Sequence, residues 1–135
     1  MPHLTVEYSA NLEEDVDIAA FCTAMRDAML ATGIFPLGGI RVRAFPCHTY
    51  VIADGDPRYA YLHMICRIGA GRDADTRLAA AEAIYGAAEG HLRARIGDRP
   101  MGLSLDLDEL HPRTSLKRFN TVHDAVAAKE RTAKA

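Results

Sequence analysis

Three residues of this chain have the chemistry and positions needed for acid–base work on an anionic molecule: Pro2, Arg41 and Arg72. A proline directly after the initiator methionine becomes a free secondary amine once Met1 is removed. An α-amino group titrates at about 7.7 to 8.0 when unperturbed, and burial beside cationic side chains lowers that pKa toward neutrality. Pro2 is therefore a candidate general base, a hypothesis that fails if Met1 is retained in the working protein.

The two arginines each follow a glycine-containing turn. Arg41 comes shortly after the Gly38-Gly39 pair, and Arg72 comes directly after Gly69-Ala70-Gly71. Glycines allow a ligand to approach the backbone closely, and arginine binds a carboxylate through two parallel hydrogen bonds. This spacing alone does not identify a site, because an arginine near the end of a strand is more often solvated or paired within the structure.

The first half of the chain predicts the elements that would position Pro2 and Arg41. Residues 3–8 alternate polar and apolar, the pattern of a half-buried strand, which would tie the amino end into a sheet. A helix should follow, with Asn11 or Asp15 as its N-cap and Gly33 after its end. A second strand is expected from Ile40, with an interruption at Pro46 and a continuation over residues 49–53. The apolar positions of the helix are Phe21, Ala24, Met25, Ala28 and Met29.

The second half repeats the same order of elements. Residues 59–68 alternate as a long strand, Asp73 or Asp75 is the expected N-cap of a second helix, and residues 101–108 alternate as the last strand. We therefore expect an α/β chain, an α+β sandwich in which two β-α-β units form a four-stranded sheet with two helices on one face. The uncovered face needs a partner, which favours an oligomer. After His111 the periodicity is weak, apart from a short segment over residues 122–127.

Length and composition indicate one ordinary globular domain over residues 1–135, with a tail from about residue 112 whose last residues fray. The chain is 49% hydrophobic and 25% charged, and its net charge of -2 argues against nucleic acid as the main partner. It has no apolar run of about 20 residues and no signal-peptide pattern, so we expect a cytoplasmic protein without a membrane partner.

The cysteines and histidines do not suggest a metal site. Cys22, Cys47 and Cys66 are odd in number and lack paired spacing, so we interpret them as reduced and mostly buried thiols. The six histidines are scattered along the chain, and no spacing places two of them on one helix face.

Several motifs occur in a specific order along the chain. They are the Met-Pro-His start, ATGIFPLGGIRVR at 31–43, ADG at 53–55, HM at 63–64, IGAGR at 68–72 and ELHP at 109–112. Together they resemble the 5-carboxymethyl-2-hydroxymuconate Δ-isomerases of the tautomerase superfamily. The resemblance extends from Pro2 to about His123.

The resemblance implies a duplicated β-α-β subunit, a homotrimer, no cofactor and a catalytic amino-terminal proline, here Pro2. Arg41 and Arg72 match the family's substrate-binding arginines. The implied substrate is a small anionic polycarboxylate dienol from the catabolism of homoprotocatechuate, an aromatic acid. Pro2 would move a proton from the 2-hydroxyl to carbon 5, Arg41 would stabilise the charge that develops on the 2-oxygen, and Arg72 would grip a carboxylate.

Further residues and other functions remain open on the sequence alone. The Lys117-Arg118 pair and His63 could add to an anion pocket, although a solvated charge pair and an interface histidine explain them more simply. A sister tautomerase acting on another 2-hydroxydienoate or on an arylpyruvate enol would use the same proline and arginines. A non-catalytic sensing or interaction module, in which Met1 is retained, is the alternative of another class.

Overall fold

The computed structural model describes residues 1–134, which form two β-α-β units followed by a further helix. The first unit contains the strand β1 (His3–Ser9), the 3-10 helix η1 (Ala10–Glu14), the helix α1 (Ile18–Ala31), the 3-10 helix η2 (Leu37–Gly39) and the strand β2 (Arg41–Cys47). The second contains β3 (Ala60–Ile68), α2 (Ala74–Arg93) and β4 (Met101–Glu109), and α3 (Val122–Lys134) comes last.

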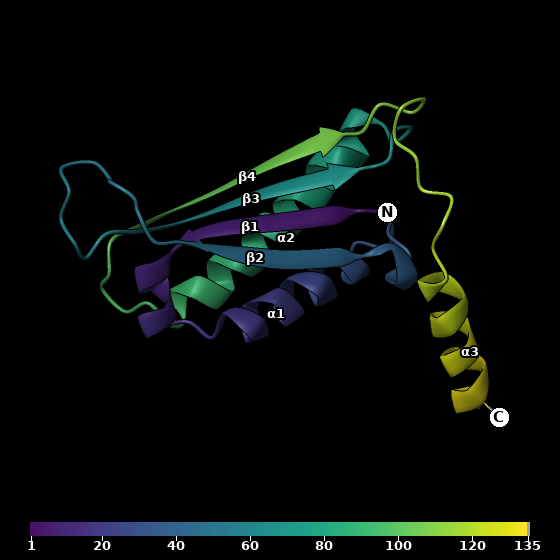
Figure 1. Ribbon diagram of the computed structural model, residues 1–135, viewed down its shortest axis with the longest axis horizontal. Helices are drawn as coiled ribbons and strands as arrows, with labels where there is room; N and C mark the ends of the chain where they lie inside the picture. Colours follow the sequence, from purple (N-terminus) through teal and green to yellow (C-terminus); the bar gives the residue numbers. More distant parts are fainter. Residues whose placement is uncertain (135) are drawn as a thin grey trace.

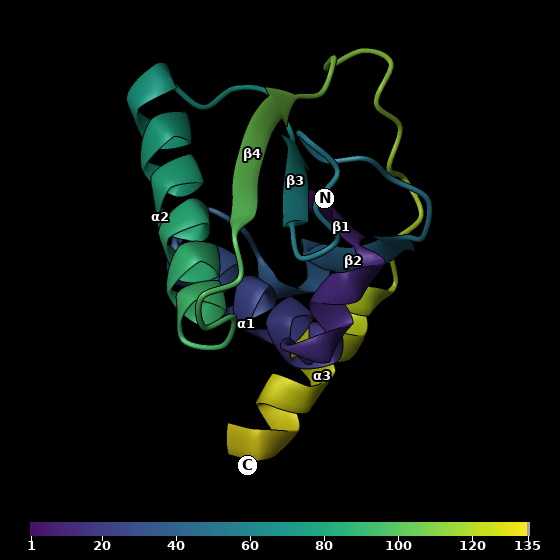
Figure 2. The ribbon, with the colours of Figure 1, turned by 90° about the vertical axis from the view of Figure 1, so that its left-hand side faces the viewer.

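The four strands form one sheet in the order β2-β1-β3-β4. Strands β1 and β2 run parallel, as do β3 and β4, whereas the two central strands β1 and β3 run antiparallel. Figures 1 and 2 show α1 and α2 together on one side of this sheet. The predicted fold, two β-α-β units with both helices on one face, is confirmed.

The core lies between the sheet and these two helices. Every second residue of β1 and β3 is buried, because successive side chains of a strand point to opposite faces and only one face is covered. The largest fully buried side chains come from both strands, from both helices and from η1: Leu4, Val6, Leu62, Met64, Cys66 and Ile68 from the strands, Phe21, Met25, Met29, Ile84 and Leu92 from the helices, and Leu12 from η1.

The N-cap predicted for α1 is wrong. The cap is Asp17, whose side chain accepts a hydrogen bond from the Ala20 N–H at 3.1 Å. The two expected residues are used in tertiary contacts instead: the Asn11 side-chain amide donates to the Tyr59 carbonyl at 2.7 Å, and Asp15 pairs with Arg99 at 2.7 Å. The cap of α2 is Asp73, one of the two candidates, which accepts from the Thr76 N–H at 2.7 Å.

The second strand also differs from its prediction. β2 continues through Pro46 to Cys47, and residues 49–53 form no strand. Pro46 is tolerated because β2 lies at the edge of the sheet, where a residue without an N–H breaks no ladder on the open side. The chain instead makes a loop over residues 48–59, which carries Val51 with 85% of its surface exposed.

The end of the chain is more regular than the sequence predicts. The segment expected over 122–127 is the start of α3, which extends to Lys134. This helix buries no residue and packs against η2, away from the main core. Figure 1 shows it beyond the end of the sheet where β1 begins, connected to β4 by a long irregular segment. No helix of residues 1–134 is long and apolar enough to cross a membrane.

Candidate active site

The sheet topology brings the three predicted site residues to one end of the molecule. His3 is paired with Arg41 of β2 on one side and with Arg67 of β3 on the other, so the start of β1 lies beside the start of β2 and the end of β3. The Arg41 N–H donates to the Pro2 carbonyl at 3.0 Å. Arg72 follows the end of β3 by four residues, so both glycine-containing turns lie around the buried Pro2.

The guanidinium of Arg41 is held by backbone carbonyls and one amide side chain. Its Nη1 donates to the Gly38 carbonyl at 2.9 Å and to the Ile40 carbonyl at 3.1 Å, and its Nη2 donates to Asn120 Oδ1 at 3.4 Å. Asn120 also donates from its amide nitrogen to the Gly38 carbonyl at 3.4 Å. The segment before α3 therefore orients Arg41.

Arg72 is fixed against the other β-α-β unit. Its Nη1 donates to the Gly69 carbonyl at 3.1 Å and its Nη2 to the Ile34 carbonyl at 2.8 Å. The guanidinium also lies 5.2 Å from the centre of the Phe35 ring, within cation–π distance. Ile34 and Phe35 belong to the turn after α1, where Gly33 has a positive φ of 78°.

Both arginines keep their charge free for an anion. Within residues 1–134 neither of them pairs with a carboxylate, in contrast to Arg77, which contacts Glu109 at 3.0 Å, and Arg99, which contacts two acids. Their backbone hydrogen bonds set their orientation without neutralising them. A carboxylate entering this end of the sheet would find two preorganised guanidinium groups.

The environment of the terminal amine disfavours its charged form. Its pKa lies below the ordinary value of 8.0, first because the amine is desolvated by burial and then because Lys117, Arg41 and Arg72 repel the ammonium. In the structure this amine belongs to Met1. Removal of Met1 would place the free amine on the ring nitrogen of Pro2, at the same end of β1.

Three residues of this site lie after β4, two of them in the irregular segment before α3 and one in the first turn of α3. Lys117 acts on the amine, Asn120 holds Arg41, and His123 packs on the Gly38-Gly39 turn. A Cβ on Gly38 would lie 2.5 Å from His123 Nδ1 and 2.8 Å from its Cα, and one on Gly39 would lie 3.3 Å from Pro2 Cδ. The two glycines therefore allow both the proline ring and α3 to approach.

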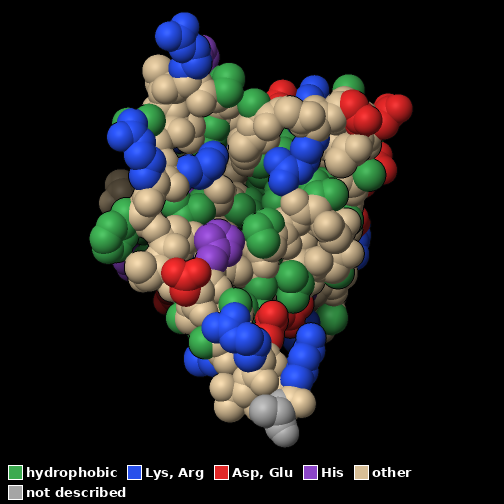
Figure 3. All heavy atoms as spheres, turned by 90° about the vertical axis from the view of Figure 1, so that its right-hand side faces the viewer, with side chains coloured by type: hydrophobic (Ala, Val, Ile, Leu, Met, Phe, Trp, Pro, Cys, Tyr) green, Lys and Arg blue, Asp and Glu red, His purple; other side chains and the backbone are tan. Residues whose placement is uncertain are grey.

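Figure 3 views the molecule from this end and shows several Lys and Arg side chains around exposed apolar ones. Of the further candidates from the sequence, Lys117 acts on the amine, whereas Arg118 is not among the charges that shift its pKa. His63 lies elsewhere, on the uncovered face of the sheet. There its Nδ1 is 2.6 Å from Ser104 Oγ and its Nε2 is 3.7 Å from Asp106.

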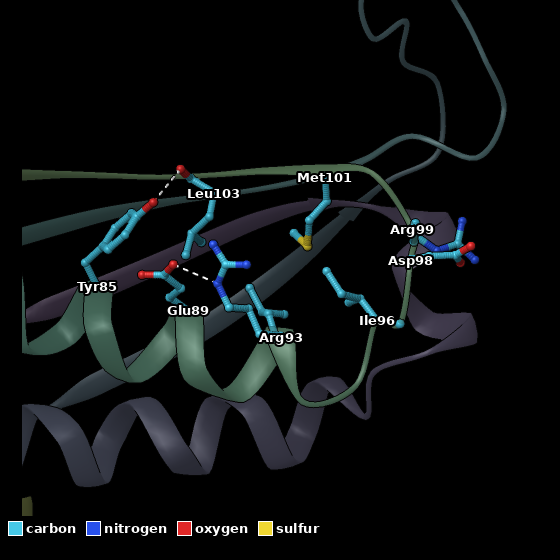
Figure 4. Close-up of a pocket in the computed structure, with 10 residues that line it drawn as sticks. Tyr85, Glu89, Arg93, Ile96, Asp98, Arg99, Met101 and Leu103 are labelled. Atoms are coloured by element: carbon cyan, nitrogen blue, oxygen red, sulfur yellow. Dashed lines mark hydrogen bonds and ion pairs between the residues drawn. The ribbon is translucent and has the colours of Figure 1, made fainter.

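A cavity of about 280 Å³ lies between α2 and β4 (Figure 4). Its polar groups are paired within the protein: Arg93 contacts Glu89 at 2.8 Å, and the Tyr85 hydroxyl donates to the Leu103 carbonyl at 3.3 Å. It lies toward the start of β4, whose first residue Met101 pairs with the start of β3, whereas Pro2 lies beside the end of β3. This cavity is therefore separate from the amine site.

The cysteines and possible metal ligands add no chemistry to this picture. Cys66 is buried, while Cys22 and Cys47 are only half-buried, so the expectation of mostly buried thiols holds for one of the three. In the described part of the chain, no three His, Cys, Asp or Glu side chains gather closely enough to hold a metal ion.

Comparison with known proteins agrees with this geometry. Residues 2–126 match the family model described as 5-carboxymethyl-2-hydroxymuconate isomerase. The chain is 40% identical over 123 residues to the 5-carboxymethyl-2-hydroxymuconate Delta-isomerase of Escherichia coli, which covers 91% of this chain and 97% of that protein.

Solved structures give the same result. The crystal structure of a 5-carboxymethyl-2-hydroxymuconate isomerase from Deinococcus radiodurans R1 superposes with a TM-score of 0.84 at 33% identity, over 93% of each chain. A fused 4-OT wild-type symmetric trimer shares the fold, with a TM-score of 0.63 at 21% identity over 87% of this chain and 92% of that one. The chain belongs to the 5-carboxymethyl-2-hydroxymuconate isomerase family, within the tautomerase superfamily.

Proposed function

We propose that this protein is a cofactor-independent isomerase that converts 5-carboxymethyl-2-hydroxymuconate to its 2-oxo-3-ene isomer, in the catabolism of homoprotocatechuate. The observation that carries the proposal is the amino end of β1, buried and surrounded by Lys117, Arg41 and Arg72, which together lower the pKa of its amine. A neutral amine among cations is suited to take a proton from an anionic substrate.

The reaction transfers one proton and moves two double bonds. The neutral amine of Pro2 takes the proton of the 2-hydroxyl, and the electrons of the O–H bond form the carbonyl at carbon 2. The double bond between carbons 2 and 3 shifts to carbons 3 and 4, and the electrons between carbons 4 and 5 take the proton back from the Pro2 ammonium at carbon 5. The amine is neutral again at the end of the cycle.

Arg41 and Arg72 have different parts in this proposal. Arg41 lies nearest in the backbone to Pro2 and is anchored through the Gly38 carbonyl, so it would stabilise the negative charge on the 2-oxygen of the dienolate. Arg72, held from the other unit at Ile34, would bind a carboxylate at the far end of the substrate. The bound carboxylates would raise the pKa of the amine again, which favours the protonated intermediate.

The same proposal includes one domain that assembles as a homotrimer. The buried residues of both units form a single continuous core. The uncovered face of the sheet carries half-buried side chains such as Thr5 and Ile65, and Phe45 on the edge strand β2 is 53% exposed. Burial of these surfaces against other copies would remove apolar area and two open sheet edges from water.

The test compares protein with and without the initiator methionine. Intact mass should show the loss of Met1, and the trimmed protein should consume 5-carboxymethyl-2-hydroxymuconate in a spectrophotometric assay. A matched protein with one additional residue before Pro2 should fold equally well but lose turnover, because its Pro2 nitrogen is then an amide. Equal turnover by the two proteins would show that the amine has no part in the mechanism. Faster turnover of an arylpyruvate enol than of 5-carboxymethyl-2-hydroxymuconate would show that the proposed substrate is wrong.

A further inference from the structure

Lys117 lies at the amine site, on an exposed part of the segment between β4 and α3. A Cβ on Gly69 would lie 3.6 Å from its Nζ, and Gly69 is also the residue whose carbonyl anchors Arg72. Lys117 therefore reaches the end of β3, beside Arg72, from the segment that follows β4. Among the described residues it makes no hydrogen bond or ion pair, so its three N–H donors are available to a ligand.

Of the three cations that surround the amine, Lys117 acts on it most strongly. Arg41 and Arg72 are each fixed by backbone carbonyls, whereas Lys117 is exposed and unanchored. The amine is the group that returns the proton to carbon 5 in the proposed reaction. A substituent on carbon 5 must therefore lie close to the amine. Lys117, whose Nζ lies beside Gly69 just after the end of β3, is the unanchored cation at this end of the sheet.

The proposed substrate has three carboxylates: one at each end of the muconate chain and one on the carboxymethyl branch, which is attached to carbon 5. In the proposed reaction Arg41 faces the 2-oxygen and can also pair with the adjacent carboxylate on carbon 1, and Arg72 binds the carboxylate at the far end of the chain, which leaves the branch. We propose that Lys117 binds the carboxylate of this branch and so determines the preference for a tricarboxylate over a dicarboxylate dienol. This inference rests on the proposed function and assigns one more residue of that site.

Turnover tests the inference through two substrates that differ only in the branch, 5-carboxymethyl-2-hydroxymuconate and 2-hydroxymuconate. Lys117→Gln should lower kcat/KM for the first by about tenfold, as expected for a lost charge-assisted hydrogen bond, and leave the second nearly unchanged. Lys117→Arg should restore most of the preference because the charge remains. Rates are compared at a pH where the amine is neutral in every variant, so that its protonation does not contribute.

Arg118→Gln is the matched control, since it removes one charge from the next position of the same exposed segment and should leave the selectivity of wild type. If Lys117→Gln slows both substrates equally, or neither, the inference is wrong even though the isomerase function stands.

Binding of stable probes separates this failure from a failure of the function itself. The probes are glutarate and tricarballylate, which is glutarate with one additional, branching carboxylate. Calorimetry on wild type should show tighter binding of tricarballylate than of glutarate. Lys117→Gln should abolish this difference. That result supports the third-carboxylate role even if wild type fails to turn over the dienol. Equal binding of the two probes by wild type would overturn it.

Discussion

Two effects with the same sign act on the terminal amine. Burial removes water from the ammonium, and Lys117, Arg41 and Arg72 repel it, so both lower its pKa. His3, on the first position of β1, experiences the same environment: burial and then Arg43 lower the pKa of its imidazole. The end of the sheet is therefore a region where neutral bases and anions are favoured.

At this scale the first prediction concerns Pro2. Pro2→Ala, in protein without Met1, should keep the fold and lose about 100- to 10,000-fold in turnover, the usual contribution of a positioned general base. A primary amine on a flexible residue has a different basicity and a less defined position. Steady-state kinetics measure the loss, thermal melting checks the fold, and unchanged turnover at neutral pH would contradict the role.

The second prediction separates the two arginines. Arg41→Ala should lower kcat, because it removes charge stabilisation from the dienolate, whereas Arg72→Ala should mainly raise KM by removing a carboxylate clamp. Arg72→Lys should recover little, since a point charge lacks the planar fork that also stacks on Phe35. Alanine variants that both match wild type in kcat and KM would place the anion site elsewhere.

The third prediction is a pH profile. The base is active when neutral, so kcat/KM should rise with pH through the amine pKa, and this rise should lie below pH 8.0, the ordinary value. Removing a cation takes away part of the repulsion that acts on the ammonium, which raises the amine pKa. Arg72→Ala should therefore move the rise in kcat/KM to higher pH. Arg118→Gln should leave it in place, and a rise at the same pH in all three proteins would contradict the electrostatic account.

At the scale of the elements, the site depends on how the last helix meets the first β-α-β unit. α3 packs against η2, and His123 lies directly over Gly38, whose carbonyl accepts from both Arg41 and Asn120. The turn before β2 is therefore shared by the proposed active-site end of the sheet and by the helix outside the core.

A single methyl group should test this contact. Gly38→Ala places a Cβ within 2.8 Å of the His123 backbone, which cannot move away as a flexible side chain can, so α3 and Asn120 should shift and kcat/KM should fall. Gly86→Ala on α2 is the control, because its Cβ would meet nothing within 4 Å and should leave activity intact. Ending the chain at residue 121 removes His123, so it should relieve the strain that Gly38→Ala adds, measured by thermal melting.

The sequence predicts those elements whose side chains pack on the core. β1, β3 and β4 cover one face of a core, so residues 3–8, 60–68 and 101–108 alternate and are recognisable. α3 buries no side chain, so it leaves only a short periodic pattern, and the contacts of Asn120 with Arg41 have no sequence signal. The cap of α1 was missed because Asn11 bonds to a loop far along the chain.

At the scale of the whole molecule, the sheet is covered on one face only. On its other face the Tyr61 hydroxyl donates to a Glu7 carboxylate oxygen at 2.9 Å, and His63 Nδ1 lies 2.6 Å from Ser104 Oγ. The half-buried Ile65 lies on the same face. Such a mixed surface is typical of an interface between copies rather than of a core. The two edge strands β2 and β4 also keep one side unpaired within the described chain.

The assembly gives the last prediction. Wild type should sediment as a trimer in analytical ultracentrifugation, and Ile65→Glu, which places a charge on the uncovered face, should dissociate it. Leu78→Glu, on an exposed position of α2 on the helical side, is the matched control and should remain a trimer. A stable and active wild-type monomer would contradict the proposed assembly.

The packing of α3 against η2, together with Lys117 and Asn120 in the segment before it, also implies an order of events during synthesis. Pro2 leaves the ribosome first, while Lys117, Asn120 and His123, which surround its end of the sheet, are among the last described residues to emerge. If Pro2 is the base that we propose, an aminopeptidase has to remove Met1, and it reaches Met1 most freely while the nascent chain is still open, before folding buries Pro2. Maturation would then be co-translational, and a newly made chain would become active only when its distal segment has been released.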